Sequence, residues 1–134
     1  MKKLIIHSDG GARGNPGPAG IGVIINDESG GVVAEISKFL GVATNNQAEY
    51  RALIAGLEKA VDLKADAVAC FLDSELVVKQ INREYKVKNK ELAPLFLAVC
   101  NLLTKFKNYN FCHIPREQNS TADRLANEAM DKGL

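Results

Sequence analysis

Two acidic residues follow apolar runs that are typical of buried strands. Asp9 closes the first apolar run of the chain, and Asp73 closes the run at residues 67–72. Each has an ordinary interpretation, because an Asp-Gly pair is typical of a turn and Asp73 could cap a helix that begins at Ser74. The alternative is that both carboxylates are placed for chemistry.

Two further acids stand at predicted helix starts. Glu49 shares the apolar stripe of its helix, and a buried carboxylate is costly unless it is paired or bound to a metal; a half-exposed acid favoured by the helix dipole is the competing interpretation. Asp123 lies three residues after Ser120, which is also the spacing of a capping box. Each acid is therefore ambiguous when it is considered alone.

Taken together, the four acids predict a metal site. Parallel neighbouring strands end at one edge of a sheet, so Asp9 and Asp73 would emerge there, and the two helix starts can reach that edge. Clustered carboxylates repel one another unless a cation binds them, and ligand sets made only of oxygen favour Mg²⁺ or Mn²⁺ over zinc. Such a cluster is best suited to phosphoryl transfer, in which two ions activate a water and stabilise the leaving oxygen.

The elements that would position these acids follow from the hydrophobic pattern. Glycine and proline are so frequent between residues 10 and 22 that we expect a loop there. Thr44 to Gln47 fits a capping box at the start of a long helix. The predicted strands lie around residues 4–9, 21–25, 32–39, 67–72 and 110–114, and the other predicted helices span residues 74–83, 91–107 and 120–132.

This order of elements predicts an α/β fold. Three strands in an antiparallel meander, followed by crossover units, give a five-stranded mixed sheet flanked by helices. The helix between the third and fourth strands should place the fourth strand parallel to the first. The 134 residues fit a single domain, residues 1–134.

Composition narrows the class of protein only slightly. The net charge is +1 and 25% of the residues are charged, so any basic surface for nucleic acid must be local. No apolar run approaches the roughly 18 residues that span a bilayer, and the N-terminus turns polar too soon for a signal peptide, so we expect a cytoplasmic protein. The three cysteines form no metal-ligand spacing and are expected to be reduced core residues. With only two histidines, no zinc cluster is predicted.

Four motifs, in order and across nearly the whole chain, resemble type I ribonuclease H. The opening motif is SDGGARGNPG at residues 8–17, and the second is TNNQAEY at 44–50. The third is LDS at 72–74, and the last runs from HIPREQN at 113–119 through AD at 122–123 to LAN at 125–127. The element order predicted above is also that of this family.

The resemblance implies an endonuclease that hydrolyses the RNA strand of RNA/DNA hybrids and leaves 5′-phosphate and 3′-hydroxyl ends. It implies that Asp9, Glu49, Asp73 and Asp123 are the catalytic residues and bind two Mg²⁺ ions, with Mn²⁺ as a possible substitute. Asp9 would bridge the ions, Asp123 would hold the ion that activates water, and the other two acids would hold the ion at the leaving 3′ oxygen.

The resemblance also implies a set of substrate contacts. A glycine-rich loop allows close approach of the backbone, and amide side chains suit minor-groove edges and 2′-hydroxyl groups. The implied contacts are Gly10, Gly11, Arg13, Gly14, Asn15, Thr44, Asn45, Asn46, Gln47 and Asn119.

Two departures from the family pattern matter. Some members carry a long basic, Trp-rich insertion after the short helix, whereas here only residues 85–90 fill that place. Their lysines, Lys86, Lys88 and Lys90, could contact phosphates or simply be solvated. Many relatives also use a mobile His in the final loop as an auxiliary group; His113 and Arg116 are both candidates, and we favour Arg116 as a fixed cation.

Other functions remain open at this point. The chain could be a hybrid-binding module without catalysis, a junction resolvase or transposase-like nuclease, a domain of a larger reverse transcriptase, or a nuclease that accepts double-stranded RNA. We expect a monomer that binds no membrane and needs no obligate protein partner.

Overall fold

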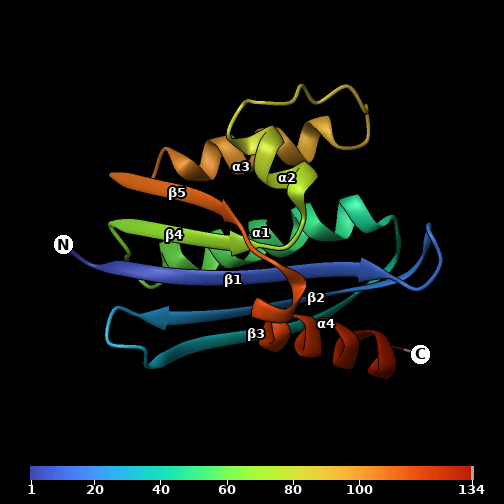
Figure 1. The fold of residues 1–134 in the computed structure, drawn as a ribbon, viewed down its shortest axis with the longest axis horizontal. Coiled ribbons are helices and arrows are strands. Elements are labelled where there is room, and N and C mark those ends of the chain that lie inside the picture. The colour runs from blue at the N-terminus through green and yellow to red at the C-terminus, as the bar shows by residue number, and fades with distance from the viewer. Residues whose placement is uncertain (134) are drawn as a thin grey trace.

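The computed structural model describes residues 1–133, and its central feature is a five-stranded sheet in the order β3-β2-β1-β4-β5 (Figure 1). β1 pairs antiparallel with β2 and parallel with β4, and β5 is parallel to β4. The predicted α/β class and the direction of the fourth strand are thus confirmed. The elements are β1 Lys3–Ala12, β2 Gly17–Asp27, β3 Val32–Ala43, α1 Asn45–Asp62, β4 Ala67–Leu72, α2 Glu75–Ile81, α3 Ala93–Leu103, β5 Asn108–His113, the short 3₁₀ turn η1 Arg116–Gln118, and α4 Ser120–Lys132.

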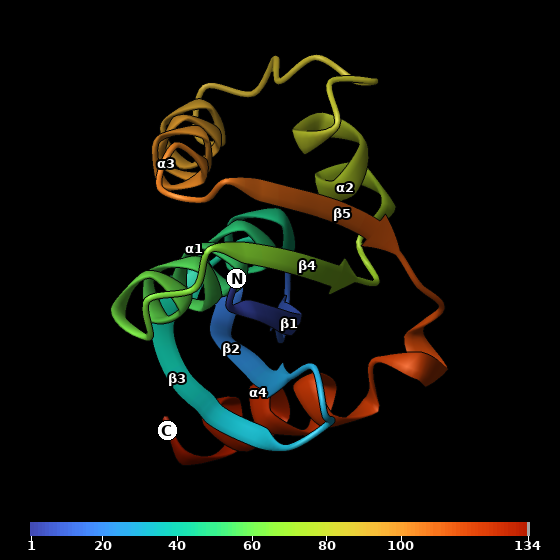
Figure 2. The same cartoon turned by 90° about the vertical axis from the view of Figure 1, so that its left-hand side faces the viewer.

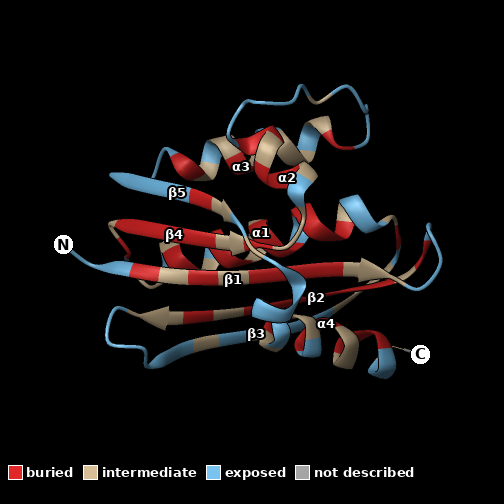
Figure 3. Cartoon of the chain, in the orientation of Figure 1, coloured by how far each residue is buried: buried red, intermediate tan, exposed pale blue. Residues whose placement is uncertain are grey.

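The helices cover the two faces of the sheet unequally. α1 and α3 pack together on one face, and α4 packs on the other face against β1, β2 and β3 (Figure 2). The largest buried cluster lies between the sheet and α1, and its members include Ile6, Leu53, Leu57 and Val68 (Figure 3). β4 is buried along almost its whole length, as expected for a strand covered on both edges. No helix among residues 1–133 is long and apolar enough to cross a membrane.

The predicted cap of α1 is confirmed. The Thr44 hydroxyl accepts the backbone N–H of Gln47 at 3.1 Å, and the Gln47 side chain accepts the backbone N–H of Thr44 at 2.8 Å. This reciprocal pair satisfies two donors at the helix start. It also fixes the start of α1 at Asn45, and Glu49 follows about one helical turn later.

The predicted long loop between residues 10 and 22 is wrong. β1 continues to Ala12 and β2 begins at Gly17, so only residues 13–16 lie outside the sheet. Asp9 therefore lies inside β1, where it is paired with Gly22, rather than at a strand end. Glycine frequency predicted a loop, but Gly10, Gly20 and Gly22 lie within the two strands, where they let helices pack closely on the sheet.

Other boundaries also moved. β3 runs to Ala43, beyond the predicted end at residue 39, and α3 is shorter than the predicted 91–107. The N-cap of α4 is Asn119, whose side chain makes no cap hydrogen bond, so the predicted capping box at Ser120 is absent. The cysteines are all free thiols, but only Cys70 is fully buried.

Candidate active site

A cavity of about 550 Å³ lies where the carboxyl-terminal part of β1 and the end of β4 meet the starts of α1 and α4. The pairing of Ser8 with Leu72 is the last one between β1 and β4, so Asp9 and Asp73 follow it side by side. All four predicted catalytic acids line this cavity. The lining residues are Asp9, Gly10, Gly11, Ala12, Arg13, Asn45, Asn46, Glu49, Asp73, Ser74, Arg116, Asp123, Ala126, Asn127 and Met130.

Two glycines allow α1 and α4 to approach the sheet closely enough to place Glu49 and Asp123 at the cavity. A Cβ at Gly10 would overlap the backbone carbonyl of Ala48, so only glycine lets α1 approach close enough to place Glu49 beside Asp9. On the other face, a Cβ at Gly22 would overlap the carbonyl of Ala122 in α4. Because Gly22 pairs directly with Asp9, this second close approach brings the start of α4 to the same point of the sheet.

Three of the acids form a tight cluster. Asp9, Glu49 and Asp73 each offer a carboxylate oxygen, and these oxygens all lie within 4.8 Å of one another. Asp9 is 8% exposed and Glu49 is 7% exposed. Glu49 Oε1 accepts the backbone N–H of Gly10 at 3.0 Å, while its Oε2 is buried without a hydrogen-bond partner among the described residues.

The electrostatics of this cluster favour a bound cation. Burial, together with the nearby carboxylates of Asp73 and Asp123, raises the pKa of Asp9 to about 7, although the hydrogen bond with Glu49 opposes this rise. Burial, followed by the adjacent Asp9, also raises the pKa of Glu49 well above its ordinary value. The three carboxylates offer only oxygen ligands, and the buried Oε2 of Glu49 has no hydrogen-bond partner among the described residues. Such a ligand set fits a hard divalent cation. The residues present therefore fit the metal that the sequence motifs imply.

Asp123 stands slightly apart from the other three acids. Its carboxylate is 3.4 Å from Nη2 of Arg116, and its side chain is 31% exposed. Asn127, one helical turn later, donates to the Asp123 backbone carbonyl at 3.0 Å. Of the two auxiliary candidates, Arg116 lines the cavity, whereas His113 is exposed at the end of β5 and does not.

The predicted amide contacts form a network at the other end of the cavity. The Asn45 side-chain oxygen accepts the backbone N–H of Ala12 at 2.8 Å, and the Asn15 side-chain oxygen accepts the backbone N–H of Asn45 at 3.0 Å. The side-chain oxygens of Asn15 and Asn45 are thus used within the protein, and their NH₂ groups make no hydrogen bond with residues 1–133. These two donors are available to a ligand. Gly14 and Asn15 belong to the short loop beside the cavity rather than to its lining.

Three other predicted contacts have structural partners. The side chains of Thr44 and Gln47 are engaged in the α1 cap, and Gln47 also lies 3.4 Å from Glu91. Asn119 is 1% exposed and donates to the carbonyl of Ser8 at 2.9 Å, at the point where β4 no longer pairs with β1. Contact of these three with substrate stays a prediction.

The sequence interpretation missed part of the cavity wall. Ala126 and Met130 form an apolar surface on α4, and Asp131 pairs with Arg13 at 2.6 Å. Helical spacing could have indicated the wall, because residues 123, 126, 127 and 130 share one face of a helix. The pairing of Arg13 with Asp131 joins segments more than 100 residues apart, so nothing local could have indicated it.

A mixed five-stranded sheet with a carboxylate cluster at its central strands defines the ribonuclease H-like fold. The model of the family described as reverse transcriptase-like matches residues 7–129. A bifunctional protein of Mycobacterium tuberculosis is 48% identical over 130 residues, covering 96% of this chain and 36% of that protein. Ribonuclease HI of Halobacterium salinarum is 46% identical over 125 residues, covering 93% of this chain and 63% of that enzyme.

A solved structure extends the likeness to three dimensions. LC11-RNase H1, isolated from compost, was solved in complex with an RNA/DNA hybrid. It is 47% identical and superposes with a TM-score of 0.91, covering 97% of this chain and 98% of that one. The chain spans about a third to two thirds of the length of the first curated relatives that it matches. It belongs to the type I ribonuclease H family, in the compact form without the basic insertion.

Proposed function

We propose that this chain is an endonuclease that hydrolyses the RNA strand of RNA/DNA hybrids and leaves 5′-phosphate and 3′-hydroxyl ends. The observation that carries the proposal is the cluster of Asp9, Glu49 and Asp73, with carboxylate oxygens within 4.8 Å of one another. Buried carboxylates with raised pKa values, here Asp9 and Glu49, are typical of a functional site rather than a structural one.

The proposed cofactor is a pair of Mg²⁺ ions, with Mn²⁺ as a substitute. Asp9, Glu49, Asp73 and Asp123 would hold them. When bound, such ions supply an activated water and stabilise charge on the leaving oxygen. The protein keeps the carboxylates close together, and it keeps Arg116 beside Asp123 as a fixed cation at the edge of the cavity.

Selection of a hybrid would come from the amide end of the cavity. The NH₂ groups of Asn15 and Asn45 are oriented by hydrogen bonds through their own oxygens, so they are donors of fixed position. Such donors suit the 2′-hydroxyl groups and minor-groove acceptors of an RNA strand. The relative that is 47% identical was solved with a hybrid bound, which supports this substrate class.

Arg116 is proposed as the auxiliary group in place of His113, because Arg116 alone of the two lines the cavity. We also propose that residues 1–134 act as one catalytic domain, as a monomer in the cytoplasm and without an obligate protein partner. The single large core cluster supports the first of these points.

The deciding experiment is cleavage of one labelled sequence presented as RNA/DNA hybrid, double-stranded RNA, double-stranded DNA and single-stranded RNA. Each substrate is incubated with Mg²⁺, Mn²⁺ or EDTA. The wild-type protein is compared with Asp73→Asn and with Asp62→Asn, which makes the same chemical change at an exposed residue at the end of α1. We expect cleavage of the hybrid RNA strand by wild type and Asp62→Asn, and almost none by Asp73→Asn or with EDTA.

The other outcomes identify the alternatives. Hybrid binding without cleavage would favour a binding module. Equal cutting of double-stranded RNA would indicate a broader duplex nuclease. Wild-type activity in Asp73→Asn would contradict the metal assignment.

A further inference from the structure

Two arginine side chains, Arg13 and Arg116, line the cavity, and each is paired with an acidic residue of α4. Arg116 pairs with Asp123 at the first turn of α4, and Arg13 pairs with Asp131 at its last turn. Asp123 belongs to the proposed metal site, which explains its presence. Asp131 does not line the cavity, and the proposed reaction gives it no role.

The Arg13–Asp131 pair is not needed to hold the loop. The backbone N–H of Arg13 donates to the carbonyl of Pro18 at 2.8 Å, and Asn15 is bonded to the start of α1. The backbone at Arg13 is therefore fixed independently of its side chain. Asp131 instead acts on the guanidinium of Arg13, because its Oδ1 lies 2.6 Å from Nη1 of Arg13.

The ion pair between Arg13 and Asp131 is weak enough for another anion to replace Asp131. Both side chains are solvent-exposed, at 44% for Arg13 and 64% for Asp131, and exposed ion pairs are weak. A guanidinium binds a phosphate through two parallel hydrogen bonds, which is a stronger arrangement than a single exposed carboxylate contact. A nucleic-acid strand in the cavity would thus compete with Asp131 for Arg13.

We propose that Asp131 sets the affinity of the enzyme for its substrate by occupying Arg13 until a backbone phosphate displaces it. This inference rests on the proposed function, since it assumes that a nucleic-acid strand enters the cavity. Asp131 is neither catalytic nor a metal ligand in this scheme. It weakens ground-state binding, because its carboxylate must be displaced and then remains near the bound phosphates.

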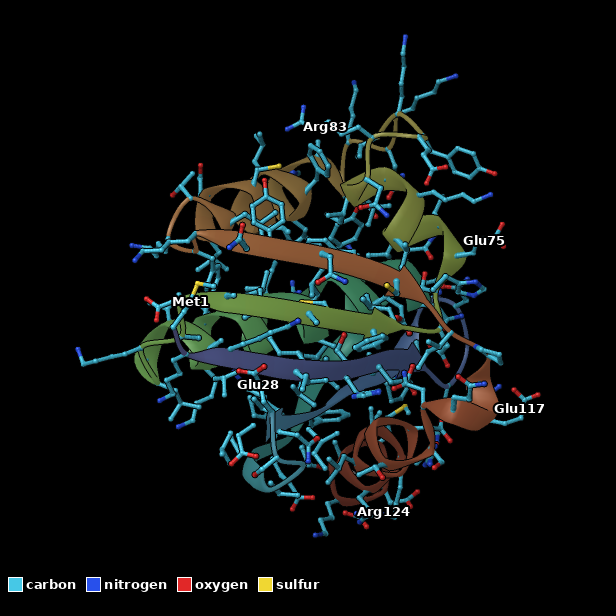
Figure 4. The ribbon with its side chains drawn as sticks, turned by 60° about the vertical axis from the view of Figure 1, so that its left-hand side comes forward. Met1, Glu28, Glu75, Arg83, Glu117 and Arg124 are labelled. Carbon is cyan, nitrogen blue, oxygen red and sulfur yellow. The ribbon has the colours of Figure 1, made fainter. Side chains whose placement is uncertain are left out.

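The chain offers a matched control on the same helix. Glu128 pairs with Arg124 at 2.8 Å, and Arg124 does not line the cavity but lies on the outer side of α4 (Figure 4). Asp131→Asn and Glu128→Gln therefore remove the same charge from one helix, and each releases one arginine. Only the first releases an arginine of the cavity.

The test is hybrid cleavage by wild type, Asp131→Asn and Glu128→Gln at about 50 and about 200 mM salt. We expect Asp131→Asn to lower KM about threefold at the lower salt with kcat unchanged. The slope of log KM against log salt should steepen by less than about one. In wild type, salt weakens the competing Arg13–Asp131 pair as well as the phosphate contact, and the variant lacks this partial compensation. Glu128→Gln should change KM much less, and in an Arg13→Gln background Asp131→Asn should have no effect.

Three results would overturn the proposal. Equal effects of the two single variants would mean that only net charge matters. A higher KM in Asp131→Asn would mean that Asp131 orients Arg13 productively. A persisting effect in the Arg13→Gln background would exclude Arg13 as the mediator. If wild type fails to cleave, the proposed function fails by itself, and the Kd of the same variants for the hybrid, measured by fluorescence anisotropy, still tests Asp131.

Discussion

The two ends of the cavity are built on opposite principles. At the acidic end, buried carboxylates crowd together and one Glu49 oxygen lacks a partner among the described residues. At the amide end, the oxygens of Asn15 and Asn45 accept backbone N–H groups, and the NH₂ groups of these two residues remain for a ligand. The acidic end is therefore strained without a cation, whereas the amide end is already arranged for a ligand.

The two ends of the cavity therefore contribute to the stability of the folded protein with opposite signs. Crowded carboxylates cost free energy that only a bound cation recovers. The amide network stabilises the junction between the short loop and α1 whether or not a ligand is present. Metal should thus change the behaviour of one end and leave the other nearly unaltered.

The largest expected effect comes from separating the acids. Gly10→Ala should destabilise the protein by about 1 to 3 kcal/mol and reduce hybrid cleavage strongly, because the new Cβ would push α1 and Glu49 away from Asp9. Gly11→Ala is the matched control, since a Cβ there meets nothing nearer than 3.9 Å. Urea unfolding of both variants measures the difference. Equal stability would mean that the close approach of α1 is not what brings the acids together.

A smaller effect is expected on the stability of the metal-free protein, and it should depend on pH. The folded-state pKa of Asp9 is raised to about 7 from 3.8, so the folded protein holds this proton more tightly than the unfolded chain. The stabilisation from the proton is present at low pH and is lost as pH rises through about 7. In EDTA at pH 8, Asp9→Asn should therefore be more stable than wild type by about 1 to 2 kcal/mol, a value reduced from the full shift by water in the cavity.

The same comparison contains its own control. The advantage of Asp9→Asn should shrink toward pH 4, where both proteins carry a neutral group at this position in the folded state. Saturating Mg²⁺ should reverse the order by stabilising wild type alone. Thermal unfolding across pH measures both, and a wild-type protein that is the more stable one in EDTA at pH 8 would argue against strain at the acidic end.

The smallest effect is expected at the amide end. Asn45→Ala removes the acceptor of the Ala12 N–H and should cost about 1 kcal/mol of stability, together with a higher KM for the hybrid. Asn46→Ala should raise KM without loss of stability, because its side chain lines the cavity but bonds to nothing among residues 1–133. Neither change should alter the response to metal. A changed Mg²⁺ dependence in Asn45→Ala would show that the two ends are coupled.

The agreement between sequence and structure is uneven for physical reasons. The cap at Thr44 and the buried run of β4 were predicted correctly, because each depends on neighbours within a few residues. The stretch from residue 10 to 22 was predicted as a loop, because glycine has the same local signature whether it forms a turn or makes room for a helix. Only the position of α1 and α4 on the two faces of the sheet distinguishes these cases.

The sequence by itself determined the α/β class, the order of the elements along the chain and the four acids that line one cavity, because hydrophobic periodicity and short motifs are local properties. The tertiary structure decided the rest. It brought Glu49 to Asp9 through the gap at Gly10, it assigned Asn119 to the carbonyl of Ser8, and it paired Arg13 with Asp131. These contacts join residues far apart in the chain, and their energies depend on burial and distance, which no local pattern encodes.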